Sequence, residues 1–104
     1  MQNVVEMITK EKAKEIVERH INSMTQPEED RYIVVDESTI SKDWGWVFFY
    51  TSEKWHTTRE LRYAVVGNAP LIVEKDSGNL FVTGTAMPIE NYIQRYETVG
   101  DPNA

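Results

Sequence analysis

A dense aromatic stretch near the middle of the chain constrains the fold most. It reads Asp43-Trp44-Gly45-Trp46-Val47-Phe48-Phe49-Tyr50 and holds two of the three tryptophans. From residue 46 to residue 52 the aromatic and β-branched side chains are typical of a β-strand. Successive side chains of a strand face opposite sides, so Trp46, Phe48 and Tyr50 face one way and the apolar residues between them face the other. Both sides are therefore covered, which predicts a central strand. The stretch carries no catalytic group, which favours recognition over turnover.

Two hairpins are predicted from the strand patterns. Residues 32–40 are rich in β-branched side chains and roughly alternate, so we expect them to pair antiparallel with residues 46–52. Residues 71–75 and 80–83 form two more short strands on either side of a turn that contains Gly78. Glycine supplies the positive φ that a tight hairpin turn needs, so these two strands are also expected to pair.

A helix is predicted near each end of the chain. Thr9 is placed to cap the first helix, which breaks before Pro27. Its apolar stripe at helical spacing consists of Ala13, Ile16, Val17, His20, Ile21 and Met24. Pro88 is expected to be the first residue of the second helix, and Gly100-Asp101-Pro102 to end it. The stripe of the second helix consists of Ile89, Tyr92, Ile93 and Tyr96.

Residues 53–66 are the least regular part of the chain. Trp55 is expected in a polar loop there, and the alternation of Leu61, Tyr63 and Val65 resembles one more strand. Together the elements predict an α+β fold, an antiparallel sheet of four to five strands with the N-terminal amphipathic helix packed on it and a short C-terminal helix. We expect one domain, residues 1–104, in two layers, because the helices have to cover the exposed face of the sheet.

Composition and charge exclude several functions. The formal net charge of −6 opposes binding to nucleic acid or to an anionic membrane surface. No apolar run reaches the ~20 residues of a membrane-spanning helix, and no signal peptide is recognisable, so we expect a cytoplasmic protein. The chain has no cysteine, which rules out disulfides and zinc-thiolate sites.

No catalytic, metal or cofactor site is predicted. His20 lies on or beside a helical stripe and His56 in a loop, without the paired spacing of metal ligands. Ser52, His56 and Glu60 contain the residue types of a catalytic triad, but no motif places the serine as a nucleophile. We therefore expect a protein that is not an enzyme and binds no cofactor.

The order of motifs resembles one known family. An N-terminal helix is followed by Trp46-Val47-Phe48-Phe49-Tyr50, then by Gly67-Asn68-Ala69-Pro70-Leu71-Ile72-Val73, a Gly78 turn and Pro88-Ile89-Glu90-Asn91-Tyr92-Ile93. Over nearly the whole chain this order resembles the bacterial immunity protein 35 family, also called YrhB-like. The resemblance implies a small cytoplasmic protein that binds and neutralises a cognate polymorphic toxin by occlusion. A holdase-like chaperone for unfolded clients is the alternative that the resemblance allows.

Trp44 and Trp55 are the predicted aromatic contacts, because one precedes the central strand and the other lies in the polar loop. The predicted acidic contacts are Glu28, Glu29, Asp30, Asp36 and Glu37, which would steer a basic partner surface. The alternative is that these carboxylates only form a solvated loop and strand edge. We expect the protein to act as a monomer or a weak homodimer, with the toxin as its partner.

Overall fold

The computed structural model describes residues 7–23, 30–64 and 68–104. Its helices are α1 (Lys10–Ile21), α2 (Glu53–Thr58) and α3 (Ile89–Val99), with 3₁₀ turns η1 (Asp36–Ser38) and η2 (Leu61–Tyr63). Its strands are β1 (Tyr32–Val34), β2 (Ile40–Lys42), β3 (Gly45–Phe48), β4 (Tyr50–Ser52), β5 (Leu71–Glu74) and β6 (Leu80–Val82). The predicted α+β class is confirmed.

The strands form two antiparallel sheets. One contains β2, β3, β5 and β6 in that order, and the other contains only β1 and β4. As predicted, the β3 strand is central, because it lies between β2 and β5. The predicted hairpin around Gly78 is confirmed as well, since β5 pairs with β6 and Gly78 has a φ of 75°.

The first hairpin is interrupted in a way that the sequence pattern did not predict. The expected single strand over residues 32–40 is wrong, because η1 separates β1 from β2. Tyr32 pairs with Ser52, whereas after η1 Ile40 pairs with Val47, so η1 shifts the register and the continuous ladder is lost. The expected strand over residues 46–52 is likewise divided at Phe49 into β3 and β4.

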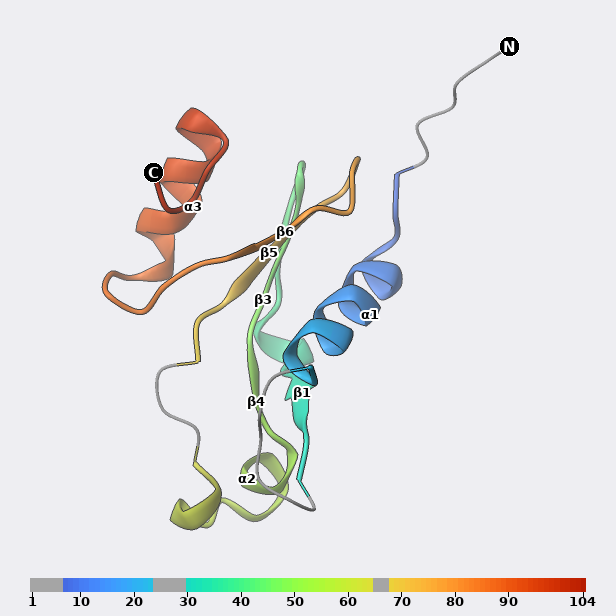
Figure 1. The fold of residues 1–104 in the computed structure, drawn as a ribbon, viewed down its shortest axis with the longest axis vertical. Coiled ribbons are helices and arrows are strands. Elements are labelled where there is room, and N and C mark those ends of the chain that lie inside the picture. Colours follow the sequence, from blue (N-terminus) through green and yellow to red (C-terminus); the bar gives the residue numbers. More distant parts are fainter. Residues whose placement is uncertain (1–6, 24–29, 65–67) are drawn as a thin grey trace.

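A helix covers each face of the sheet, so the expected two layers become three. Figure 1 shows α1 on one side of β3, β5 and β6 and α3 on the other side. Ala13, Val17 and Ile21 of α1 are fully buried in a cluster with Trp46 and Phe48. On the opposite face, Ile93 and Tyr96 of α3 pack on Val47 and Ile72, which are the alternate residues of the central strands. Alternate apolar side chains of β3 thus belong to two separate cores, one on each face of the sheet.

Both terminal helices begin near the residues that the sequence indicates, and α1 ends at Ile21, while Met24 of its expected stripe lies outside the described residues. The hydroxyl of Thr9 accepts a hydrogen bond of 3.1 Å from the amide of Lys12, as an N-cap does. Pro88 is the N-cap of α3 rather than its first residue, and Gly100 ends the helix with a φ of 77°. The predicted stripe of α3 is confirmed, with Tyr92, Ile93 and Tyr96 buried.

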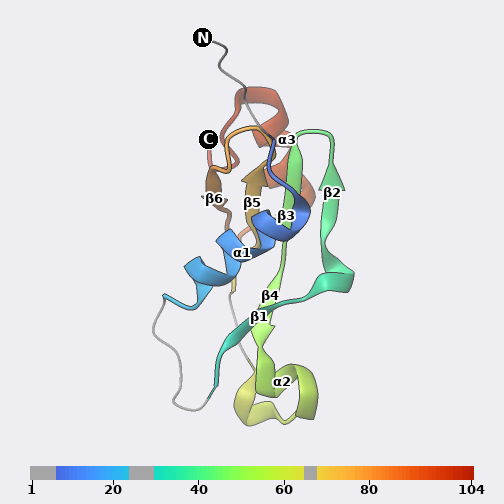
Figure 2. The same ribbon diagram turned by 90° about the vertical axis from the view of Figure 1, so that its right-hand side faces the viewer.

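Residues 53–63 form two short helical turns instead of a loop and a strand. Trp55 lies on α2, and Leu61 and Tyr63 lie on η2, so both expectations for this segment are wrong. Val65 and Gly67 lie outside the described residues. Figure 2 shows α2 beyond the end of the β1–β4 ladder, away from α1 and α3.

Candidate partner-binding site

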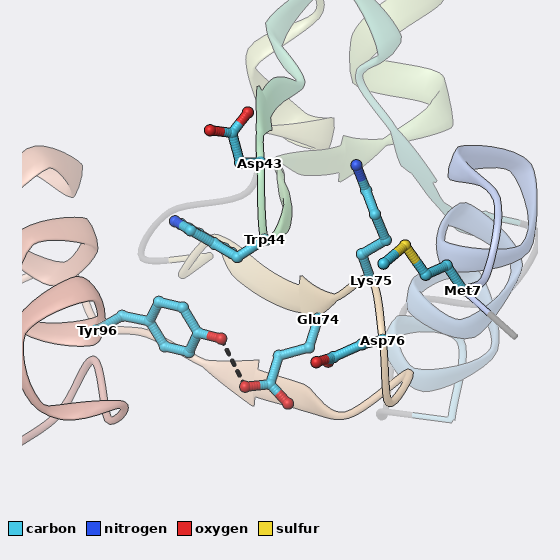
Figure 3. Close-up of a pocket in the computed structure, with 7 residues that line it drawn as sticks. All are labelled: Met7, Asp43, Trp44, Glu74, Lys75, Asp76 and Tyr96. Atoms are coloured by element: carbon cyan, nitrogen blue, oxygen red, sulfur yellow. Dashed lines mark hydrogen bonds between the residues drawn. The ribbon is translucent and has the colours of Figure 1, made fainter. Parts of the chain in front are cut away.

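A small hollow lies where the β2–β3 turn and the β5–β6 turn meet α3. Its volume is about 140 Å³, and its lining residues are Met7, Asp43, Trp44, Glu74, Lys75, Asp76 and Tyr96. Figure 3 shows Tyr96 and Glu74 pointing toward each other across it. Three of the lining residues are acidic and two are aromatic, so the hollow combines negative charge with ring surface.

Backbone pairing brings these distant segments together. Gly45 faces Glu74 in the β3–β5 ladder, and the amide of Lys75 donates a 2.8 Å hydrogen bond to the carbonyl of Trp44. The carbonyl of Lys75 accepts a 2.9 Å hydrogen bond from Ile8, just before α1. The turn between β2 and β3 is therefore fixed beside the start of the turn between β5 and β6.

Trp44 packs its ring against Tyr96 of α3. Its ring centroid lies 4.4 Å from that of Tyr96, at an interplanar angle of 48°. Its indole nitrogen donates a 2.9 Å hydrogen bond to Glu97. Trp44 is half-buried, so one part of the indole packs on α3 while another part stays accessible. This packing holds the accessible surface of Trp44, one of the two predicted aromatic contacts, in a defined place.

Glu74, which lines the hollow, is held as an anion. Ser77 donates a 2.6 Å hydrogen bond to one carboxylate oxygen, and the phenol of Tyr96 donates a 2.5 Å hydrogen bond to the other. The bond from Ser77, then that from Tyr96, lower the pKa of Glu74 below its usual value. Burial, reinforced by the bond to Glu74, raises the pKa of Tyr96 well above its usual range. At neutral pH the pair is therefore a carboxylate and a neutral phenol, so the hollow keeps a fixed negative charge at Glu74.

Asp30 has a structural role that the sequence did not indicate. Its carboxylate accepts hydrogen bonds from the hydroxyl of Ser52 and from the amides of Arg31 and Lys54, the last at 3.2 Å. Burial raises the pKa of Asp30, but these hydrogen bonds outweigh it, so the pKa lies below its usual value. Ser52 is buried and also accepts a bond from the amide of Trp55, as the N-cap of α2. Asp30 and Ser52 thus hold α2 on the β1–β4 ladder, with the serine hydroxyl acting both as donor and as acceptor.

The other predicted acidic contacts do not gather around the hollow. Asp36 lies on η1 and forms a 2.9 Å ion pair with Lys14 of α1, which raises the pKa of that lysine chiefly through the side-chain hydrogen bond. Glu37 is exposed on the same turn. Glu28 and Glu29 lie outside the described residues. None of the predicted carboxylates that the structure describes lines the hollow.

Trp55 and Trp44 lie at opposite ends of the fold. Figure 1 shows α2 at one end of the long axis, while α3 and the two hairpin turns lie at the other. The two tryptophans therefore belong to separate surfaces and not to one aromatic centre. Trp55 is half-buried, with the guanidinium of Arg59 5.6 Å from its ring centroid.

Sequence reasoning missed the partners of Trp44 in the hollow. Tyr96 was recognised only as part of a helical stripe, and Glu74 only as part of a strand. The signal that would have found them is the register between β3 and β5, because pairing of residue 45 with residue 74 places the β5–β6 turn beside Trp44.

Residues 7–23, 30–64 and 68–104 contain neither a candidate membrane-spanning helix nor a candidate metal-binding cluster. Within those ranges, no helix is long and apolar enough to cross a membrane. Within the same ranges, histidine and carboxylate side chains form no cluster of three that would hold a metal ion.

Comparison with known proteins gives the family. The model of immunity protein 35 matches residues 11–97. The chain belongs to this family. The uncharacterized protein YrhB of Escherichia coli strain K12 is 42% identical over 53 residues, which are 51% of this chain and 56% of YrhB. The chain thus matches just over half of the length of that relative. No solved structure is detectably similar. The resemblance found in the sequence is confirmed, and the matching family is described as one of immunity proteins.

Proposed function

We propose that this member of the immunity protein 35 family binds a cognate polymorphic toxin and neutralises it by occlusion, without catalysis. The observation that carries the proposal is the aromatic and acidic hollow formed by Trp44, Tyr96, Glu74 and their neighbours, in a chain that the family description links to immunity. We place this action in the cytoplasm and assign it to a monomer or weak homodimer that binds no nucleic acid, membrane or cofactor.

The hollow is suited to a basic toxin surface. Asp43 and Asp76 are exposed at its rim, and Glu74 is kept ionised by its hydrogen bonds. Carboxylates at a rim steer encounter and set orientation, while a fixed aromatic ring supplies contact area. The predicted aromatic contact Trp44 keeps its role here, whereas the acidic partners come from the two hairpin turns.

Preorganisation favours tight binding at this end of the molecule. Trp44 is fixed by Tyr96 and Glu97, and its carbonyl is bonded to Lys75. Side chains that are already ordered lose less entropy on association, at about 0.5–1.5 kcal/mol for each flexible side chain. The free protein therefore presents its binding geometry before the toxin arrives.

The test begins with affinity purification of the tagged protein from its native lysate, followed by co-expression with the protein recovered. If that protein stops growth alone and is neutralised by this chain, the immunity function is established. We expect Asp43→Asn with Asp76→Asn to weaken rescue, while the matched pair Glu11→Gln and Glu90→Gln, also exposed, leaves rescue unchanged. Equal rescue by both pairs would remove the hollow from the proposal.

The exposure of Leu61 favours the chaperone alternative, because 85% of this large apolar residue is accessible to solvent. A holdase-like protein would use apolar surface to bind many unfolded clients. Recovery of many unrelated proteins, together with suppression of their aggregation, would support that alternative against the immunity function.

A further inference from the structure

The segment formed by α2 and η2 has no role in either core. None of its helical residues is buried, and Leu61 is among the most exposed large apolar residues of the described chain. Short helices in proteins normally persist because one face packs on the core. Here the polar bonds around Ser52 and Asp30, together with the 2.8 Å bond from the amide of Glu53 to the carbonyl of Arg31, hold the segment in place.

Cationic side chains lie against the aromatic rings of this segment. Arg62 lies 4.8 Å from the ring centroid of Tyr63, and Lys54 lies 5.3 Å from the same centroid. Arg59 lies 5.6 Å from the ring centroid of Trp55. We call Lys54, Trp55, Arg59, Leu61, Arg62 and Tyr63 the cationic ridge. Tryptophan, tyrosine and arginine are the residue types enriched at interface hot spots.

The backbone at Arg59 shows that this geometry is imposed. Arg59 has a φ of 60° and ends α2. Within the described ranges, no other non-glycine residue has a positive φ. A glycine would take this conformation without strain. The arginine side chain is nonetheless present, and its head lies near the Trp55 ring.

We propose that the cationic ridge is a second docking surface, which binds a short acidic segment of a protein partner with an apolar side chain between its carboxylates. The carboxylates would meet Arg59 and Arg62, whose planar heads suit two-point bonding, and the apolar side chain would cover Leu61. Arg62 is weakly held in the free protein, because its contact with Glu60 measures 3.4 Å and both side chains are exposed. A partner carboxylate can take the place of Glu60 there.

Charge selects this occupant over a longer polyanion. The protein carries a net charge of −6, so a nucleic acid or an anionic membrane meets repulsion from the rest of the molecule. A short segment with a few carboxylates contacts the ridge alone, and at physiological salt charges beyond about 8 Å are largely screened. The chemistry of the ridge is also opposite to that of the acidic hollow at the far end, so the two surfaces suit different partners.

The experiment is an NMR titration of the isotope-labelled full-length protein with a short peptide that has leucine between two pairs of glutamates. We expect shifts of the Trp55 indole and of the amides of residues 59–63, which weaken as salt is raised. The same peptide with serine in place of leucine, and a lysine version, should bind at least about tenfold more weakly. Absence of shifts at about 10 mM peptide, or equal binding of the lysine version, overturns the proposal.

Variants separate binding from folding. Arg59→Gly keeps the backbone conformation, so the fold should be intact while peptide affinity falls about threefold to tenfold; Arg62→Gln should act in the same direction. Lys10→Gln and Arg95→Gln remove exposed charges elsewhere and serve as controls. If the controls weaken binding equally, the effect is one of overall charge and the ridge is not a site. Stronger binding of an oligonucleotide, or shifts that depend on protein concentration without peptide, would assign the ridge to nucleic acid or to a second copy and overturn the acidic segment.

Discussion

The phenolic oxygen of Tyr96 lies 2.5 Å from a carboxylate oxygen of Glu74, so the last helix is joined to β5 by a hydrogen bond to an anion. Tyr96→Phe removes this bond and leaves the packing of the ring, and we expect a loss of about 1–2 kcal/mol in the free energy of unfolding. Chemical denaturation measures it. Tyr63→Phe, on a ring outside both cores, is the control and should change stability by less than about 0.5 kcal/mol. Equal effects of the two variants would contradict the assignment.

Stability should fall at both ends of the pH range. The pKa of Glu74 is lowered in the folded protein, so its stabilisation is present above the usual value of 4.5 and is lost as pH falls through the folded pKa. The pKa of Tyr96 is raised, so its stabilisation is present below the usual value of 10.0 and is lost as pH rises above it. Unfolding measured from pH 3 to about 11 should show a smaller alkaline loss in Tyr96→Phe than in the parent protein. Parallel alkaline limbs would show that Tyr96 does not contribute.

Gly45→Ala should be among the most destabilising single changes. A Cβ at this position would overlap the backbone carbonyl oxygen of Val73, across the central β3–β5 ladder, where neither strand can move freely. Gly100→Ala also meets a positive φ, but no atom lies within 4 Å of its Cβ. Thermal unfolding should show a loss of about 1 kcal/mol for Gly100→Ala and several times more for Gly45→Ala. Similar losses would show that β3 and β5 can separate to admit the methyl group.

The N-cap residues Thr9 and Ser52 differ in burial, so their removal should lower the free energy of unfolding by different amounts. Ser52→Ala removes the cap of α2 and leaves Asp30 without its buried donor, so we expect a loss of about 2 kcal/mol. Thr9→Ala removes the exposed cap of α1, at a cost of about 1 kcal/mol. Hydrogen exchange of the α2 amides gives a local readout, because Ser52→Ala should accelerate it far more than Thr9→Ala does. Unchanged exchange in α2 would mean that the Asp30–Ser52 bond does not hold the segment.

Thr39→Val should leave stability unchanged or raise it by up to about 1 kcal/mol. The hydroxyl oxygen of Thr39 is buried and has no hydrogen-bond partner in the described part of the chain. Valine has nearly the same shape, and the extended backbone at this residue, with a ψ of 132°, suits it. Denaturant titration of the variant measures the change, and Thr39→Ser separates the loss of the methyl group from the loss of the hydroxyl. A clear destabilisation by valine would show that the hydroxyl has a partner.

The apolar alternation of the central strands and the stripes of the terminal helices could be predicted from the sequence. Each depends only on local periodicity, and Trp46, Phe48 and Val47 face the sides that a two-residue period requires. The number of layers could not be predicted in the same way. The alternation in β3 indicates two covered faces, but only packing shows that α1 takes one face and α3 the other.

The interruptions and the acidic hollow escaped prediction for different reasons. Asp36 and Glu37 are residue types that are depleted in strands, so they left a weak local signal for η1, but the register shift across η1 is set by the pairing on either side. The α2 helix did leave a local signal, since Ser52 followed by the acidic Glu53 is a helix start. Glu74 and Tyr96 are 22 residues apart, and a contact of that separation cannot be read from local periodicity.

The exposed charges of the two proposed contact surfaces lie outside the two cores, and this has a consequence for how this family can diversify. Asp43 and Asp76 at one end, and Arg59 and Arg62 at the other, are exposed, whereas Val17, Phe48 and Ile72 are fully buried. Substitutions at the exposed ends of a domain usually cost less than about 0.5 kcal/mol, so they seldom compromise folding. A gene encoding this architecture can therefore acquire a new recognition specificity through a few point changes while its scaffold stays as it is.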